Sequence, residues 1–342
     1  MRQSYFVLTF PFSNVGLAQV FPGENAECVC QALKNIFEYV SGVPVRIVFD
    51  NATGVGRRIS NETRTSKVFS AFAAHYGFSY SFCNPNAGHE KGSVENKVGF
   101  LRRNLFVPVR QIDCGRTFNK HLLDKCMALS DKGHYARGER ELSLFMEDKV
   151  ACLGLPSAPF DVVRYERHRA DKYGKVCIDG HHFYSSNPAF GGEELICGLH
   201  ADEVVVATSQ GKVISRHRRA YGSARTDTTD PASQLPLLAR KPRGWQNSLV
   251  RFSLSDDLRR YMDGLGGDEL KGALRTLRDV SASKGWEAAL SAAELSFEGS
   301  GRLDEASVSV AAAGIMSSPV EYEDAVDLAV YDQAMDKEPS WR

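Results

Sequence analysis

The sequence lacks several features that mark specialised classes of protein. None of its apolar runs reaches the roughly 18 residues that a membrane-spanning helix needs, and its apolar start has no small-residue cleavage site in the position that a signal peptide requires. It also lacks any excess of charge, because 42 Lys and Arg balance 42 Asp and Glu. That balance excludes a wholly basic nucleic-acid binder, but it can conceal local patches of either sign.

The chain also lacks the cysteine spacing of a metal site or a disulfide framework. It has 8 cysteines, none of them in a CxxC pair, and Cys28 and Cys30 are separated by a single residue. Such scattered cysteines are typical of buried free thiols. We therefore expect a protein of the reducing cytoplasm that has no membrane partner.

Residues 1–117 alternate between strand and helix patterns, which predicts a layered α/β domain. Asn25 is a good N-cap for the helix that follows it, and the mainly apolar run Val45–Phe49 suits the buried centre of a sheet. We expect strands at 4–11, 17–21, 45–49 and 79–82, and helices at 25–40, 66–76 and 93–105.

The remaining 225 residues divide by composition into three further parts. A mixed-charge stretch predicts a helical connector at 118–165. Five short β-branched runs separated by glycine turns predict a small all-β barrel at 166–222. Prolines, helical segments and an acidic end predict a linker and a helical, partly disordered tail at 223–342. There, Arg240, Lys241, Arg243 and Trp245 form a basic and aromatic cluster that could bind DNA or a partner protein, or could lie in a disordered linker.

Two carboxylates are candidates for catalysis. Asp50 follows the apolar strand, where open α/β sheets place their sites, and Glu95 lies 45 positions later at the start of a helix. Paired carboxylates suit Mg²⁺, which prefers oxygen ligands, and two such ions can drive phosphodiester chemistry. The alternative is that Asp50 is a turn residue and Glu95 complements a helix dipole.

Two basic stretches fit a DNA substrate, because cations on one surface can bind phosphates. Each also has a simpler interpretation. The stretch near Glu95 could be a solvated helix face, and the stretch in the predicted barrel could be an edge strand whose charges discourage pairing with other sheets. Near Glu95 the predicted contacts are Lys91, Lys97, Arg102 and Arg103. In the predicted barrel they are Lys212, Arg216, Arg218 and Arg219.

The strings FDNATGVGRR, GHEKGSVEN and GKVISRHRRAYG resemble the IstA-type transposases of bacterial insertion sequences. The resemblance implies a ribonuclease-H-like, integrase-type core with an Asp-Asp-Glu triad, in which Asp50 matches the second Asp and Glu95 the Glu. It implies 3′-end processing and strand transfer with Mg²⁺ or Mn²⁺. The partners that it implies are DNA (transposon ends and target), an IstB-type AAA+ ATPase helper and further copies of the chain, which form a homo-oligomer on DNA.

The sequence departs from that family at the first catalytic Asp. The family places it on the first strand of the core, upstream of the hairpin, but no Asp or Glu precedes Glu24 here. We therefore expect a core that lacks its first strand, binds metal weakly and is inactive alone. The alternative function is that of a non-catalytic DNA-binding regulator, or a remnant of a transposase.

Overall fold

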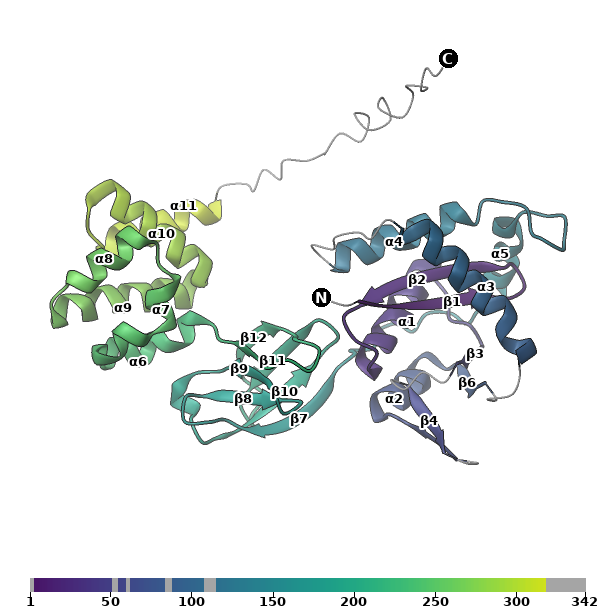
Figure 1. Cartoon of the computed structure of the whole chain (residues 1–342), viewed down its shortest axis with the longest axis horizontal. Helices are drawn as coiled ribbons and strands as arrows, with labels where there is room; N and C mark the ends of the chain where they lie inside the picture. Colours follow the sequence, from purple (N-terminus) through teal and green to yellow (C-terminus); the bar gives the residue numbers. More distant parts are fainter. Residues whose placement is uncertain (1–2, 51–54, 60–61, 84–87, 108–114, 318–342) are drawn as a thin grey trace, which may run out of the picture. The chain divides into compact units, whose positions relative to one another are not determined.

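The computed structural model describes residues 3–50, 55–59, 62–83, 88–107 and 115–317, and at 57–59, 62–64, 88–95 and 316–317 it describes the backbone alone (Figure 1). The chain divides into two compact units, Met1–Thr228 and Thr229–Arg342. Within the described ranges, no helix combines the length and the apolar character needed to cross a membrane.

The first unit begins with the predicted hairpin and helix. Strands β1 (Ser4–Phe10) and β2 (Val15–Phe21) pair antiparallel, and α1 (Ala26–Val40) follows. The Asn25 side chain accepts a hydrogen bond from the Cys28 N–H at 3.0 Å, which confirms it as the N-cap. Helix α1 ends where Ser41 adopts a left-handed conformation, with φ 57°.

A parallel pair of strands comes next. Strands β3 (Arg46–Phe49) and β6 (Ser79–Phe82) are joined through α2 (Lys67–Tyr76). Among the described residues no ladder connects this pair to the β1–β2 hairpin. Because Val48 is 51% exposed, the prediction that this strand is buried on both faces is wrong here.

Two further differences concern segments near the predicted site. The stretch after β3, where no strand or helix was predicted, forms a second hairpin of β4 (Gly56–Ile59) and β5 (Glu62–Thr65). Helix α3 (Gly88–Leu105) begins five residues before the predicted Ser93.

Helices α4 (Gly115–Leu129) and α5 (Glu141–Val150) complete the α/β part. Helices α1 and α4 pack against the hairpin (Figure 1). One apolar cluster runs through these elements, with Phe37, Phe69 and Phe72 fully buried. This core fixes the position of α3 relative to the strands.

The rest of the first unit is all-β. The five predicted strands are present, together with two that were not predicted, and they form a four-stranded sheet, β12-β11-β10-β7, and a three-stranded sheet, β13-β9-β8. The closed barrel stays a prediction. The strands are β7 (Arg164–Arg169), β8 (Lys175–Ile178), β9 (His182–Ser185), β10 (Glu194–Leu199), β11 (Glu203–Ala207), β12 (Val213–Arg218) and β13 (Thr226–Thr228).

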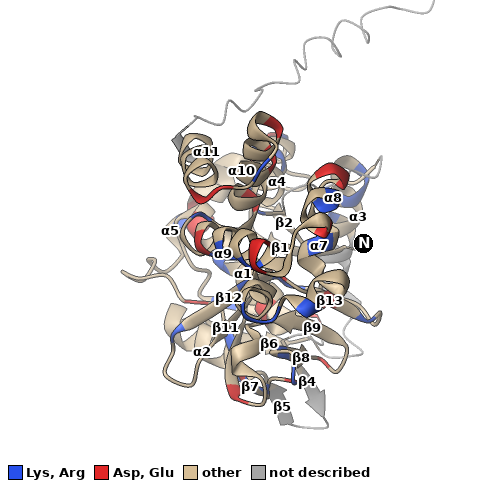
Figure 2. Cartoon of the chain, turned by 90° about the vertical axis from the view of Figure 1, so that its left-hand side faces the viewer, with Lys and Arg blue, Asp and Glu red and all other residues tan. Residues whose placement is uncertain are grey.

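The second unit is helical. Its core includes Trp245, which is 2% exposed and donates a hydrogen bond from Nε1 to Asp263 at 2.8 Å. Trp245 is therefore a core residue rather than a docking aromatic in a disordered linker. Figure 2 shows acidic and basic residues intermingled on α8 and α9. The helices are α6 (Leu235–Arg240), α7 (Leu249–Ser253), α8 (Asp256–Gly264), α9 (Gly267–Lys284), α10 (Trp286–Ser300) and α11 (Glu305–Ser317).

Candidate active site and DNA interface

Asp50 directly follows β3 and is exposed. Because β3 and β6 run parallel, with Phe49 opposite Phe82, both strands end at the same edge of the pair. The Cys83 N–H donates to the Phe49 carbonyl at 2.8 Å, so the parallel alignment continues up to Asp50. Asp50 thus lies at the edge from which the chain leads on to α3.

Glu95 lies two turns into α3 rather than in its first turn, because the helix begins at Gly88. The side chains of Glu95 and Lys91 lie outside the described residues, so the proximity of Glu95 to Asp50 stays a prediction. Carboxylates are the right donors for Mg²⁺. Among the side chains that are described, no three His, Cys, Asp or Glu form a metal-binding group.

Lys97, predicted to contact DNA, is instead buried. Its side chain is 5% exposed, and its Nζ lies 3.4 Å from Glu141, whose side chain is 1% exposed. Burial lowers the pKa of Lys97, and Glu141 opposes that effect. Gly16 on β2 makes room for the lysine, because a Cβ there would lie 2.7 Å from the Lys97 Cγ. A phosphate contact does not fit this position.

Arg102 and Arg103 remain suitable for DNA. Both are exposed in the last turns of α3. They therefore offer their charges to solvent on the helix that carries Glu95.

The second basic stretch also divides between surface and interior. Arg216 is 58% exposed and pairs with Glu203 at 2.9 Å, while Lys212 and Arg218 are exposed. Arg219, however, is 2% exposed and donates to the His200 carbonyl at 2.7 Å. In this structure its guanidinium is therefore turned to internal partners and not to the surface.

Arg219 instead helps to hold the all-β part to α1. It lies 3.7 Å from Glu27, whose side chain is 1% exposed. Arg164 on β7 donates from Nε to the other Glu27 oxygen at 2.5 Å. Glu27 is thus a buried carboxylate between two arginines, and nothing in its own segment of sequence predicts that role.

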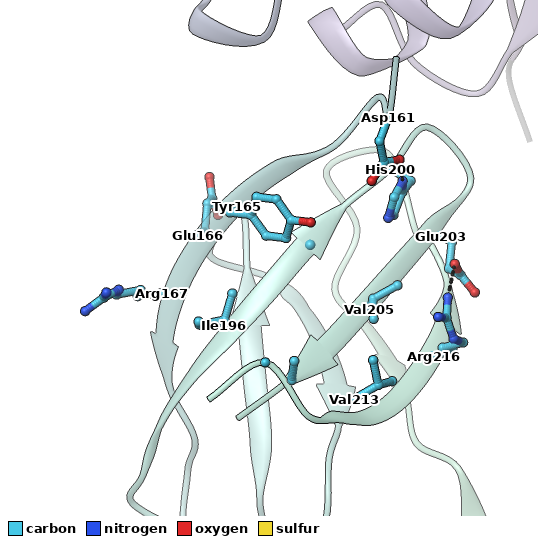
Figure 3. Close-up of a pocket in the computed structure, with 13 residues that line it drawn as sticks. Asp161, Tyr165, Glu166, Arg167, Ile196, His200, Glu203, Val205, Val213 and Arg216 are labelled. Carbon is cyan, nitrogen blue, oxygen red and sulfur yellow. Dashed lines mark hydrogen bonds and ion pairs between the residues drawn. The ribbon is translucent and has the colours of Figure 1, made fainter. Parts of the chain in front are cut away.

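A groove of about 710 Å³ crosses the four-stranded sheet (Figure 3). Its floor is apolar, with Ile196 and Val205, and the ring of Tyr165 lies over Gly198, where a Cβ would be 3.3 Å from the ring. Three acidic side chains and two arginines line it: Asp161, Glu166, Glu203, Arg167 and Arg216. A groove of this charge has no particular attraction for a phosphate backbone.

Most of the cysteines that the structure describes are buried. All seven that the structure describes are free thiols, as predicted. Burial raises the pKa of Cys126 to about 11 and that of Cys197 to about 12. A thiol becomes nucleophilic as the thiolate, so these two are poor nucleophiles at neutral pH.

Comparison with known proteins identifies the relatives of the chain. Residues 155–230 match the family "Mu transposase, C-terminal domain". The chain is 29% identical over 230 residues to a transposase for insertion sequences IS1326/IS1353 of Pseudomonas aeruginosa, covering 65% of this chain and 44% of that protein. It is 27% identical over 268 residues to a transposase of Aminobacter aminovorans, covering 75% of this chain and 52% of that protein.

A third relative is the transposase for insertion sequence element IS21 of P. aeruginosa, which is 26% identical over 247 residues, covering 69% of this chain and 60% of that protein. The chain thus spans about half the length of the relatives it matches. A solved structure of a simian T-cell lymphotropic virus intasome in complex with PP2A regulatory subunit B56 gamma matches at a TM-score of only 0.33 and 13% identity, covering 64% of this chain and 73% of that chain. The homologues of this chain are insertion-sequence transposases, as its motifs predicted, and residues 155–230 are similar to the Mu transposase C-terminal domain.

Proposed function

We propose that this chain is the core and all-β portion of a DDE-type DNA transposase, which processes the 3′ ends of an insertion sequence and transfers them to target DNA. The observation that carries the proposal is the position of Asp50, at the edge where β3 and β6 both end and from which the chain continues to α3. Its transposase homologues support the same function.

In this proposal Asp50 and Glu95 hold Mg²⁺ or Mn²⁺, and the core is of the ribonuclease-H type. Bound metal would activate a hydroxyl nucleophile and stabilise the departing oxygen of a phosphodiester. The exposed Arg102 and Arg103 would hold the DNA backbone beside these carboxylates, and Lys212 and Arg218 would hold it on the all-β part.

The proposed site holds two of the three carboxylates of the triad. Neither β1 (SYFVLTF) nor β2 (VGLAQVF) contains an Asp or Glu. We therefore expect the chain to bind metal weakly and to be inactive alone. Its proposed partners are transposon-end and target DNA, an IstB-type AAA+ ATPase and further copies of itself on DNA.

Binding of Mn²⁺, followed by electron paramagnetic resonance, tests the two carboxylates separately from catalysis. Asp50→Asn and Glu95→Gln should each weaken binding, whereas Glu90→Gln, a matched change on the same helix, should not. An unchanged affinity in Asp50→Asn, or an equal loss in Glu90→Gln, would contradict the assignment.

Strand transfer with transposon-end DNA then tests the incomplete triad. The purified chain should not join strands in Mg²⁺ or Mn²⁺. Clear joining that disappears in Asp50→Ala would support the transposase function and would contradict the prediction that the chain is inactive alone.

A non-catalytic DNA-binding regulator is the second candidate function. It is favoured by the exposed cations Arg102 and Arg103, which can bind a phosphate backbone without any metal. Such a regulator would bind element ends with a salt-dependent affinity but would join no strands even when a complete transposase is present, and it would compete with that transposase for the ends.

A further inference from the structure

A tight loop at residues 131–140 lies against α3, the helix that carries Glu95. Lys132 from this loop lies 3.7 Å above the ring of Phe100 on α3. Arg137 lies 4.1 Å from the ring of Phe12, in the β1–β2 turn. These two contacts place the loop, called here the 131–140 loop, beside the C-terminal half of α3 and the tip of the hairpin.

The backbone of the 131–140 loop is held by its own hydrogen bonds. The His134 N–H donates to the Glu139 carbonyl at 2.7 Å, and the Glu141 N–H donates to the Lys132 carbonyl at 2.9 Å. Gly138 closes the loop with φ +71°, a conformation that favours glycine. A loop that is already ordered loses little conformational entropy when it binds a partner.

The loop presents Tyr135 to solvent. This side chain is 80% exposed, and its ring is stacked on that of His134, with centroids 4.6 Å apart and planes 27° from parallel. His134 is only 7% exposed. Its Nδ1 accepts from the Ala136 N–H at 3.1 Å. Tyr135 is thus an exposed aromatic supported by a buried ring.

We propose that the 131–140 loop is a DNA contact in which Tyr135 stacks on an unpaired base at a DNA end held beside α3. Aromatic side chains next to cations bind unpaired bases regardless of sequence, because every base has a stacking face. The inference rests on the proposed function, since end processing and strand transfer bring DNA ends to this helix.

The charges around Tyr135 favour DNA over a protein partner, because Lys132, Arg137 and Arg140 outnumber Asp131 and Glu139 within the loop. Arg137 forms no ion pair with any residue that the structure describes, and the exposed Arg102 and Arg103 lie on the adjoining helix. Asp131 forms an ion pair with Arg140, at 3.3 Å. By contrast, three acidic side chains line the groove on the four-stranded sheet.

Fluorescence anisotropy with two labelled duplexes tests the proposal on the full chain, with no divalent metal added. One duplex is blunt, and the other carries a short unpaired 3′ overhang that contains 2-aminopurine. The wild-type protein should prefer the overhang and quench its 2-aminopurine, as stacking requires.

Tyr135→Ala should weaken binding of the overhang duplex by about tenfold, remove the quenching and leave blunt-duplex binding unchanged. Tyr135→Phe should retain both the preference and the quenching. Tyr173→Ala is the matched control, because Tyr173 is 60% exposed and Lys172 lies 5.0 Å from its ring in another part of the chain. It should behave as the wild type does.

The proposal is overturned if Tyr135→Ala retains the overhang preference, if the wild type does not bind the overhang duplex, or if Tyr135→Ala changes only the oligomeric state measured by light scattering. The last result would identify a protein contact instead. Because no metal is added, these outcomes are independent of Asp50 and Glu95, so the loop contact and the catalytic assignment can fail separately.

Discussion

Lys97 on α3 and Arg219 after β12 both stand in basic stretches that predict DNA binding, and both are buried against a carboxylate from a distant part of the chain. They differ in what surrounds that carboxylate. Glu141 accepts from the Asn14 side chain at 2.6 Å and has Lys132 at 3.9 Å, besides Lys97. Glu27 lies between two guanidinium groups, Arg164 and Arg219. Glu141 can therefore still accept a hydrogen bond from a neutral side chain if Lys97 is removed. The contacts described for Glu27 are with charged guanidinium groups.

The two sites share further features. Each is next to a buried thiol, Cys126 near Lys97 and Cys28 near Arg219. Each also has a glycine that leaves room for a neighbouring side chain, Gly16 beside Lys97 and Gly23 beside Tyr221. These parallels allow matched substitutions in the two sites.

Removing Glu27 should have the largest effect. Glu27→Ala leaves Arg219 buried without its carboxylate, and breaking a buried pair in this way typically costs about 3–5 kcal/mol. Chemical denaturation of the first unit measures the loss, with Arg218→Ala, at the exposed neighbouring position, as the control that should change stability little. Equal losses in both variants would show that Glu27 is not the residue that joins the two parts.

Lys97→Met should cost less, about 2–3 kcal/mol, because Asn14 and Lys132 still satisfy Glu141. The same denaturation experiment measures it, with Lys120→Met on the exposed face of α4 as the control. A loss as large as that of Glu27→Ala would remove the distinction drawn between the two carboxylate sites.

The sequence predicts local features of this fold well and distant pairings not at all. Asn25 caps α1 as predicted, and Ser66, at the start of the predicted helix 66–76, caps α2, since a cap depends on residues two or three positions away. Glu27 and Arg164, in contrast, are 137 positions apart, and Lys97 and Glu141 are 44 apart. A local charge pattern cannot show which of its members will be buried by such a partner.

Two predictions near the site were wrong for a different reason. The charged, glycine-containing stretch around β4 and β5 resembles a loop, yet it forms a hairpin. Gly88 and Gly92 are poor helix residues, yet α3 includes both. In each case the local composition is a poor guide to the structure that forms. Of the candidate site, the end of β3 at Asp50 could be predicted, whereas the role of the 131–140 loop could not, because it depends on contacts with α3 and the hairpin.

The thiol beside Lys97 should make stability depend on pH. The pKa of Cys126 is raised from 9.0 to about 11 by burial, so above pH 9 the unfolded chain releases this proton before the folded chain does. The free energy of unfolding should therefore fall as pH rises, by about 2 kcal/mol between pH 8 and 10.5 from this group alone. Cys126→Ala should show a correspondingly smaller fall, and identical pH profiles would contradict the assignment.

The two glycines should differ in their tolerance of a methyl group. At Gly23 a Cβ would lie 2.4 Å from the Tyr221 ring, and the Tyr221 hydroxyl is fixed by a 2.6 Å hydrogen bond to the Ala201 carbonyl. Gly23→Ala should therefore cost about 1–2 kcal/mol. At Gly16 the neighbour is the flexible stem of Lys97, so Gly16→Ala should cost less. Thermal unfolding of the two variants compares them, and the reverse order would mean that the lysine is the more tightly held group.

The smallest effect is expected where the cations are exposed. Replacing both Arg102 and Arg103 by Ala should leave stability within about 0.5 kcal/mol of the wild type. It should reduce the slope of log affinity against log salt concentration for duplex DNA by about 0.9 for each phosphate that the arginines no longer neutralise. Anisotropy titrations over a range of salt measure the slope, with Lys97→Met as the opposite case, which should lower stability without changing the slope. If the double variant kept the wild-type slope while Lys97→Met reduced it, the DNA-binding cations of α3 would not be the ones that are exposed in the folded chain.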